Sequence, residues 1–326
     1  MGKPIRVVTS GELRPYLEFA AVIGSVEAAY RAVAEGRLTS ARRAHLIAPG
    51  THTFLSVTPA VSADLGITVF AYTGGNRGAR VPQKLAIVFS PEDGGVRCLI
   101  ESDLLSWMRT GATSGVATRY LAREDAQVLG IFGAGKQARA QLLAVSAVRP
   151  INEALVYSPN PTSREAFATE MTEQAGFVVE AVSDPRAILA EAHIVCTATT
   201  SAVPVFDGAL VRPGTHINAI GQHYPDRREL DTKTMLSSRL FADDVDTAFI
   251  DYGEIVIPIA EGLMDSDALL TGLDGVVAGT VAGRSNEREI TVMLSGGVAA
   301  EYLAAANVAC AIAEQRGLGR EIDLMA

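Results

Sequence analysis

The chain has few cysteines, no long apolar run and no basic cluster. Its three cysteines, Cys98, Cys196 and Cys310, show no CxxC or Cys/His spacing, which predicts small buried thiols and no disulfide framework. No segment approaches the ~18 consecutive apolar residues of a membrane helix, and the first residues have no apolar signal region. We therefore expect a protein of a reducing cytoplasm, without a membrane partner.

Charge and histidine placement exclude two further classes of function. The 28 basic and 37 acidic residues give a net charge of -9, and no basic run is present to neutralise a phosphate backbone, so nucleic acid is not an expected partner. His45, His52, His193 and His216 show no spacing typical of metal ligands, so we expect no metal. The 326 residues are enough for two domains of ~150 residues, each with its own core.

The first third of the chain predicts a helix that leads into an antiparallel sheet. Ile23, Val26, Tyr30 and Val33 recur at helical spacing within residues 15–35. Short apolar runs typical of strands follow at 44–48, 53–58, 67–72, 85–89 and 96–100. Asp93-Gly94-Gly95 predicts a hairpin turn between the last two, and the glycine-rich residues 74–78 predict a loop.

From residue 127 onward, strands alternate with helices. Strands are predicted at 128–132, 155–157, 177–179, 193–197, 217–220 and 239–242. Asp184-Pro185 reads as an N-cap followed by proline at the first helical position. This alternation favours a parallel, doubly wound sheet. An alanine-rich helix over 298–315, ended by Gly317, has no strand partner in this alternation, and we expect it to return to the first domain.

One glycine-rich segment predicts a dinucleotide site. Gly133, Gly135 and Ala138 form a GxGxxA motif directly after a predicted buried strand and at the start of a helix. In this motif the first glycine permits a tight turn, the second lets the backbone approach a pyrophosphate, and the alanine keeps helix and strand close. The helix N-terminus supplies N–H groups and a positive dipole to the phosphates.

The end of the second strand favours NADP(H) over NAD(H). A carboxylate there would bind the ribose hydroxyls and repel a 2′-phosphate, and Tyr157 to Arg164 contain none. Ser158, Asn160, Ser163 and Arg164 are instead all able to donate to a phosphate. The alternative for Arg164 is a solvated residue in the first turn of a helix.

Several segments together resemble the ornithine cyclodeaminase/mu-crystallin family. They are Met108 to Ala112, the GxGxxA loop with Gln137, His216 to Gly221, Pro225 to Leu230 and Ser295-Gly296, in order along nearly the whole chain. The resemblance implies an α/β protein with a Rossmann-type doubly wound domain at 116–299. It also implies an α+β substrate-binding and dimerisation domain at 1–115 plus 300–326, and homodimers joined through the N-terminal sheets.

The resemblance also implies roles for individual residues. Arg43 and Arg109 match the arginines that hold a substrate carboxylate, and a planar guanidinium suits that task; the alternative for each is a structural ion pair. Thr68, Lys84 and Gly296 complete the substrate-binding candidates. The cofactor-binding candidates are Arg109, Gly133, Gly135, Lys136, Gln137, Ala138, Ser158, Asn160, Ser163, Arg164, Thr197, Ala219, Ile220, Arg227 and Ser295.

Two positions depart from the family pattern. The family's catalytic lysine falls on Thr68, and the acidic residue expected after the Asn-Ala-Ile-Gly strand falls on His223. Both departures count against cyclodeaminase and alanine dehydrogenase activity. His223 titrates near neutrality and is our candidate proton donor, with Lys84 on the next predicted strand as its rival; the alternatives are a loop histidine and a surface lysine.

These observations predict an NADP(H)-dependent reductase of a small imino or keto acid, similar to the family's ketimine reductases. Its partner is then a small-molecule carboxylate. Arg109, with His223 or Lys84, carries the catalysis. Two alternatives stay open: a redox-neutral cyclodeaminase that releases ammonia, and a binding protein without turnover, similar to mu-crystallin.

Overall fold

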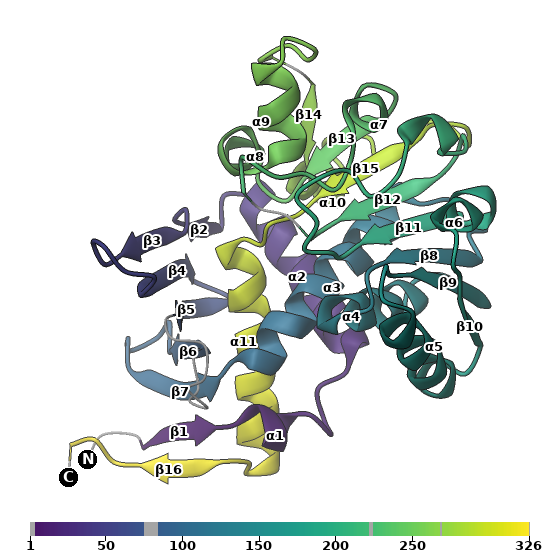
Figure 1. The fold of residues 1–326 in the computed structure, drawn as a ribbon. Helices are drawn as coiled ribbons and strands as arrows, with labels where there is room; N and C mark the ends of the chain where they lie inside the picture. The colour runs from purple at the N-terminus through teal and green to yellow at the C-terminus, as the bar shows by residue number, and fades with distance from the viewer. Residues whose placement is uncertain (1–3, 75–83, 222–223, 268, 326) are drawn as a thin grey trace. The chain divides into compact units, whose positions relative to one another are not determined.

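The computed structural model describes residues 4–74, 84–221, 224–267 and 269–325 (Figure 1). The chain forms two compact units. Unit 1 comprises Met1–Arg109 and Val298–Ala326, and unit 2 comprises Thr110–Gly297. The chain passes from unit 1 to unit 2 after Arg109, inside helix α3 (Asp103–Leu121). The boundary expected from the sequence, after residue 115, lies a few residues farther along the same helix.

Unit 1 contains an eight-stranded sheet. Its strands are β1 (Ile5–Val8), β2 (Leu38–Ser40), β3 (Ala44–Ile47), β4 (Phe54–Ser62), β5 (Gly66–Gly74), β6 (Lys84–Phe89), β7 (Val96–Glu101) and β16 (Arg320–Ile322). The order is β16-β1-β7-β6-β5-β4-β2, with β3 also paired to β4. The expectation of a purely antiparallel sheet is wrong at one pair, because β1 runs parallel to β7. The sequence analysis also missed β1, β2 and β16.

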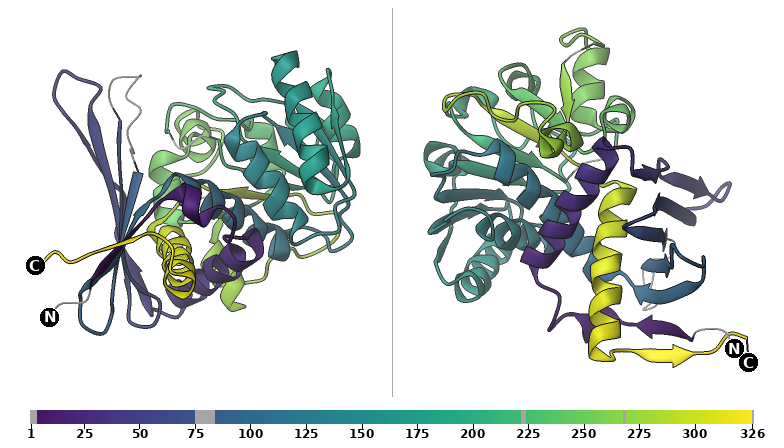
Figure 2. Two further views of the ribbon diagram at one scale, coloured as in Figure 1. Left: turned by 90° about the horizontal axis from the view of Figure 1, so that it is seen from below. Right: turned by 180° about the vertical axis from the view of Figure 1, so that it is seen from behind.

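The helices of unit 1 are α1 (Ser10–Leu13), α2 (Phe19–Ala34) and α11 (Ala299–Arg316). Helix α11 packs against β4 to β7 and against α2, and Figure 2 shows both helices on one side of the sheet. It ends at Gly317 in the left-handed conformation, as the sequence predicted. Along β4 to β7, buried side chains alternate with partly exposed ones. One face of this sheet therefore packs on α11, and among the described residues of unit 1 no helix covers the other, which we call the uncovered face.

Unit 2 contains a second eight-stranded sheet, in which every pairing is parallel. Its strands are β8 (Val128–Phe132), β9 (Glu153–Tyr157), β10 (Val178–Ala181), β11 (Ile194–Thr197), β12 (His216–Ala219), β13 (Arg239–Ala242), β14 (Leu270–Gly272) and β15 (Thr291–Leu294). The order is β10-β9-β8-β11-β12-β15-β13-β14. The sequence analysis missed β14 and β15, because both are short and no regular helix period marks the chain around them.

Within the described residues, seven α-helices and one 3-10 turn lie between these strands. They are α4 (Lys136–Ser146), α5 (Pro161–Ala175), α6 (Pro185–Glu191), the 3-10 turn η1 (Gly208–Leu210), α7 (Thr232–Leu236), α8 (Val245–Asp251), α9 (Gly253–Ala260) and α10 (Leu273–Ala278), of which α8 and α10 contact β14. Asp184 caps α6 and Pro185 opens it, as predicted. Within the described residues, no helix combines the length and apolar composition needed to cross a lipid bilayer.

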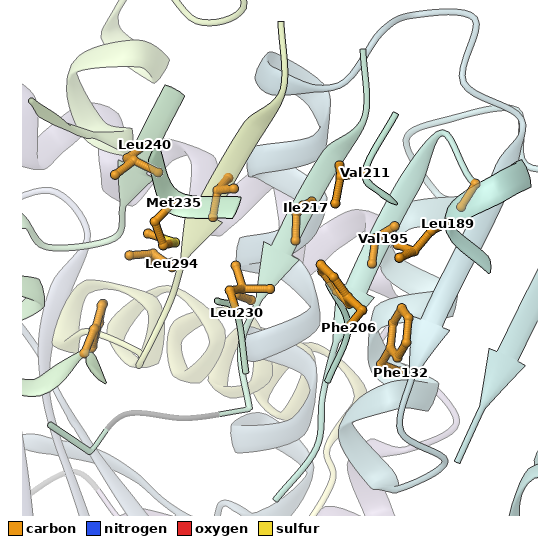
Figure 3. Close-up of a cluster of buried hydrophobic side chains, with 14 of the residues drawn as sticks. Phe132, Leu189, Val195, Phe206, Val211, Ile217, Leu230, Met235, Leu240 and Leu294 are labelled. Atoms are coloured by element: carbon orange, nitrogen blue, oxygen red, sulfur yellow. The ribbon is translucent and has the colours of Figure 1, made fainter. Parts of the chain in front are cut away.

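The sheet of unit 2 is buried on both faces. Phe132, Val195 and Ile217 belong to one hydrophobic cluster, which Figure 3 shows at close range. Leu129, Ile131 and Cys196, which point the opposite way along the same strands, belong to a second cluster. Strands with two buried faces are typical of a doubly wound sheet, and their carboxyl ends all lie at one edge.

Candidate functional site

The GxGxxA loop lies at that edge, between β8 and α4. Gly133 has φ 109°, and a Cβ there would lie 2.4 Å from the carbonyl oxygen of Ala198, so no larger residue fits. Gly135 is the N-cap of α4 in an extended conformation, and no side chain caps this helix end. The Oε1 atom of Gln137 is buried and has no hydrogen-bond partner in the described part of the chain. An uncapped helix end with an unsatisfied polar atom beside it fits a bound pyrophosphate and its ribose.

The end of β9, next to this loop, is fixed by local hydrogen bonds. The side chain of Asn160 accepts a bond from the Ser163 N–H (3.2 Å) and so caps α5. Arg164 Nη1 donates to the Ser158 carbonyl at 3.0 Å, which holds its guanidinium at the strand end. The structure thus brings together the four residues that the sequence analysis proposed for phosphate binding, although Asn160 is also the helix cap.

A buried carboxylate joins the ends of β11 and β12. Glu229 Oε2 accepts bonds from the Thr197 hydroxyl and the Gly221 N–H, both at 2.8 Å, and Oε1 accepts one from the Thr199 N–H at 2.7 Å. Burial raises the pKa of Glu229. The sequence analysis did not single out Glu229, although it lies in the Pro225–Leu230 segment that the family resemblance marked. Thr197, Ala219 and Ile220 all lie at these strand ends.

A second buried carboxylate, that of Asp243, fixes the segment after β15 by hydrogen bonds. The Ser295 hydroxyl and the Gly297 N–H donate to Asp243 Oδ2 at 2.9 and 2.8 Å, and the Gly296 N–H donates to the Tyr252 hydroxyl at 2.8 Å. Tyr252 in turn donates to Asp243 Oδ1. Sequence reasoning missed both Asp243 and Tyr252, because neither lies in a recognised motif.

In unit 1, Arg109 is buried in a polar network with α2 and α11. Its Nη1 donates to Glu301 at 2.8 Å and its Nη2 to the Tyr302 hydroxyl at 2.9 Å. Tyr30 donates to the other Glu301 oxygen at 2.7 Å. Burial opposes the charge of Arg109, but the neighbouring Tyr302 and Glu301 oxygens outweigh it and leave its pKa raised. The guanidinium is therefore a fixed positive charge with a single well-defined orientation.

The remaining sequence candidates differ in their surroundings. Thr68 is 1% exposed on the α11 side of the sheet, and its hydroxyl has no partner within the described residues. The Lys84 ammonium lies 3.3 Å from Asp103 Oδ1 and 3.4 Å from the Ser106 hydroxyl, at the start of α3. Arg43 lies between β2 and β3. Arg227 is exposed over the Tyr224 ring, and His223 lies outside the described residues.

Two cysteines that are far apart in sequence lie together. Their thiols, Cys98 on β7 and Cys310 on α11, form with Glu314 a group whose potential ligand atoms all lie within 4.8 Å of one another. The Arg97 guanidinium binds the same Glu314 carboxylate at 2.6 Å. A cation already neutralises this carboxylate, and the expectation of no metal remains a prediction.

The geometry thus places most of the described sequence candidates of unit 2 along one sheet edge, at the ends of the adjacent strands β9, β8, β11, β12 and β15. Arg227 lies farther along the segment after β12, and His223 lies outside the described residues. From β8 the chain adds β9 and β10 on one side of the sheet and then returns to add β11 and β12 on the other. Doubly wound sheets bind ligands at such a switch point, here between β8 and β11. The family model described as "Ornithine cyclodeaminase/mu-crystallin family" matches residues 7–315. The chain belongs to this family. The resemblance inferred from short motifs is confirmed over nearly the whole chain.

Individual relatives match the chain closely. A structure of Thermococcus litoralis Delta(1)-pyrroline-2-carboxylate reductase in complex with NADH and L-proline is 35% identical, with a TM-score of 0.91 over 98% of this chain and 100% of that one. An archaeal alanine dehydrogenase dimer with bound NAD is 28% identical, with a TM-score of 0.90 over 99% and 100%. The Delta(1)-pyrroline-2-carboxylate reductase of Bacillus cereus is 34% identical over 226 residues, 69% of each chain. These likenesses confirm the predicted fold class.

Proposed function

We propose that the protein is a pyridine-nucleotide-dependent reductase of small cyclic imino acids such as Δ1-pyrroline-2-carboxylate, a reaction of amino acid metabolism. The observation that carries this proposal is the full-length likeness to a reductase solved with NADH and L-proline, which would be the product. A nicotinamide bound at the GxGxxA loop would provide the hydride for the imine carbon. The protein holds the substrate carboxylate and delivers one proton to the imine nitrogen, so that the C=N bond becomes CH–NH.

The two units have different tasks in this proposal. Unit 2 binds the dinucleotide, with Gly133, Gly135 and the start of α4 at the pyrophosphate. Unit 1 binds the substrate and forms the dimer. Arg109 binds the carboxylate through its guanidinium, whose orientation Glu301 and Tyr302 fix. Arg43 is the second carboxylate ligand, and the Thr68 hydroxyl lines the substrate site where relatives place a lysine.

The proton comes from His223, with Lys84 as the rival donor. Thr68 bears no ionisable group, so a different residue has to supply the proton that the imine nitrogen takes up. An imidazole is partly protonated near neutral pH and suits this role. Lys84 is the weaker candidate, because its ammonium already has two hydrogen-bond partners, Asp103 and Ser106.

NADP(H) is favoured over NAD(H) in this proposal. Tyr157 to Arg164 contain no carboxylate, and the Arg164 guanidinium is held at the end of β9, where the adenosine ribose binds in this fold. We expect Arg164→Ala to weaken NADPH binding by about 1.5–3 kcal/mol, the value of one charged hydrogen bond, and to leave NADH binding unchanged. Titration calorimetry of both proteins with both nucleotides measures this. Equal affinities of the wild type for NADPH and NADH would contradict the preference.

A homodimer forms through the uncovered face of the unit 1 sheet. Pairing places Val69 opposite Pro59 and Ile87, and Ile87 opposite Leu99, in one apolar row across four strands. Leu55, Val61 and Leu85 on the same side are each more than a third exposed. A continuous apolar sheet face is a typical subunit interface, and a second copy of the chain presents the same face.

The activity is tested by following NADPH and NADH oxidation with a panel of cyclic imino acids and keto acids. We expect turnover with Δ1-pyrroline-2-carboxylate or its six-membered analogue, and stoichiometric formation of the cyclic amino acid. Release of ammonia from ornithine without net nucleotide oxidation would instead identify a cyclodeaminase. Nucleotide binding without turnover of any panel member would identify a binding protein.

A further inference from the structure

Two thiols from different parts of the chain lie side by side within unit 1. Cys98 is on β7 and Cys310 is on α11, and neither has exposed surface. Their sulfur atoms lie within 4.8 Å of each other and of a carboxylate oxygen of Glu314. The third cysteine, Cys196 on β11, belongs to unit 2, where the Asn218 amide lies 3.9 Å from its sulfur. The proposed reaction uses none of the three thiols.

The thiol pair joins the two chain segments from which unit 1 is built. Strand β7 belongs to the segment up to Arg109 and α11 to the segment from Val298, and the whole of unit 2 lies between them in the sequence. Helix α11 packs against β7, so a bond between the thiols would close a loop that contains unit 2. A crosslink stabilises mainly by restricting the unfolded chain, and its effect grows with the length of the loop. A single bond at this position therefore has a large effect on stability.

Charged groups surround the pair. The Arg97 guanidinium binds Glu314 at 2.6 Å, and Cys310 Sγ lies 3.6 Å from Glu314 Oε1. A hydrogen bond from the Cys310 thiol lowers the pKa of Cys98. Arg97 and Arg6 act in the same direction, whereas burial and the Glu314 carboxylate oppose the shift. Because the thiolate is the form of cysteine that attacks an oxidant, Cys98 is the thiol that reacts first, with Cys310 beside it.

We propose that Cys98 and Cys310 form a reversible disulfide when the protein meets hydrogen peroxide, and that this bond links α11 to the sheet of unit 1. First, the Cys98 thiolate attacks a peroxide oxygen: an S–O bond forms, the O–O bond breaks, and the leaving hydroxide takes up the proton that Cys98 has lost. Second, the Cys310 sulfur attacks the sulfenic acid sulfur of Cys98: an S–S bond forms, the S–O bond breaks, and hydroxide leaves with the Cys310 proton. Two thiols and one peroxide thus give one disulfide and two waters.

The geometry and the surroundings of the pair permit both steps. Sulfur is one bond from Cβ, so a change of χ1 rotamer moves it by a distance comparable to the gap between the thiols. Cys310 lies in the last two turns of α11, and the Arg97 and Glu314 side chains beside it are 33% and 42% exposed. Local opening of the helix end therefore admits a small oxidant. Cys196 lies on a strand inside the sheet of unit 2, where such opening is rarer.

The experiment treats the intact chain with hydrogen peroxide, removes the excess with catalase, and alkylates the remaining thiols after denaturation. Peptide mapping by mass spectrometry should find Cys98 and Cys310 in one crosslinked species, two hydrogen atoms lighter than the two reduced peptides, and Cys196 alkylated. The thermal midpoint of the oxidised protein should rise by about 5 °C or more. Dithiothreitol should reverse both changes.

Three alanine variants assign the effect to the pair. Cys98→Ala and Cys310→Ala should each abolish the rise in thermal midpoint on oxidation. Cys196→Ala, the matched control at a buried thiol of unit 2, should keep it. Cys310→Ala should also accumulate sulfenic acid at Cys98, which dimedone traps, because the second thiol is missing.

Four outcomes would overturn the proposal. They are three free thiols after peroxide treatment, a crosslink that includes Cys196, a crosslink that leaves the thermal midpoint unchanged, and protection of both thiols by added zinc ions with a higher midpoint in the absence of oxidant. The last outcome would assign the cluster to a metal instead. None of these measurements uses a nucleotide or an imino acid, so this inference and the proposed function succeed or fail separately.

Discussion

The sheets of units 1 and 2 contain the same number of strands but differ in how their faces are covered. In unit 2, β11, β12 and β15 are buried at every residue, and each face has its own hydrophobic cluster. In unit 1, β4 to β7 alternate between buried and partly exposed residues, and α11 covers one face. The difference teaches that unit 2 buries both faces of its sheet in its own core, which leaves the sheet edge for the proposed dinucleotide site, whereas unit 1 leaves an apolar face, the proposed dimer interface.

The largest expected effect is on turnover, and it compares the two candidate proton donors, His223 of unit 2 and Lys84 of unit 1. His223→Ala should lower turnover about 10²- to 10⁴-fold and leave dinucleotide affinity unchanged, the range for loss of a positioned acid. Lys84→Met should have a smaller effect. The reductive rate should fall as pH rises through the neutral range, because an imidazole loses its proton there while a lysine keeps it. Steady-state rates against pH measure this, and an active His223→Ala protein with an unchanged profile would assign the role to Lys84 or to water.

The next prediction concerns the buried ion pair of unit 1. Arg109→Met leaves the Glu301 carboxylate buried without its cation and should lower the free energy of unfolding by about 3–5 kcal/mol. The double variant Arg109→Met with Glu301→Gln removes both charges and should recover most of that loss. Urea unfolding compares the three proteins. Equal stability of the single and double variants would show that the unpaired Glu301 charge is not the cause of the loss.

The uncovered sheet face provides the third prediction. Ile87→Asp places a charge in the centre of the apolar row, and we expect the dimer dissociation constant to rise about hundredfold or more, because an unpaired carboxylate would be buried. Val178→Asp makes the same change at an exposed site on β10 of unit 2 and should leave the dimer intact. Light scattering over a concentration series measures both. A monomeric wild type at micromolar concentration would contradict the proposed interface.

The smallest effect belongs to Glu254 in the core of unit 2. Burial raises its pKa to about 7. An unfolded glutamate ionises near pH 4.3, so between that value and about 7 the native state holds the extra proton and stability falls as pH rises. Glu254→Gln cannot ionise. Its unfolding free energy relative to the wild type should therefore rise by about 2–3 kcal/mol between pH 5 and pH 8, as denaturant titrations at both values would measure. A difference that does not change with pH would show that Glu254 is ionised throughout.

Much of unit 2 was predictable because its signals are local. The GxGxxA motif, the Asp184 cap and the alternation of apolar strands with helices each depend on neighbouring residues, and the structure has the corresponding elements at β8, α4 and α6. Strands β14 and β15 escaped prediction because no regular helix period marks the chain around them, whereas β11 and β12 are equally short but follow the alternation of strands and helices. Only pairing with β12 and β13 defines β15 as a strand.

The residues of the candidate site likewise fall into those that a local motif reveals and those that only distant contacts reveal. Sequence alone singled out the candidates that a motif carries, such as Gly133 and Arg109, and the expected departures from the family pattern at Thr68 and His223, whose roles stay predictions. It did not identify Glu229, Asp243, Tyr252 or Glu301, because their partners lie on other strands and helices.

The sequence by itself therefore determined the family, the two kinds of sheet, the glycine-rich turn between β8 and α4 and the return of the last helix to the first unit. The tertiary structure decided which carboxylates are buried, what they hold and which sheet face is left uncovered. The physical reason is the distance along the sequence over which each kind of interaction acts. Helix period, capping and glycine turns act over a few residues, whereas Glu229 and Thr197 are 32 positions apart and Arg109 and Glu301 are 192 apart, and only the folded chain brings each pair within hydrogen-bond distance.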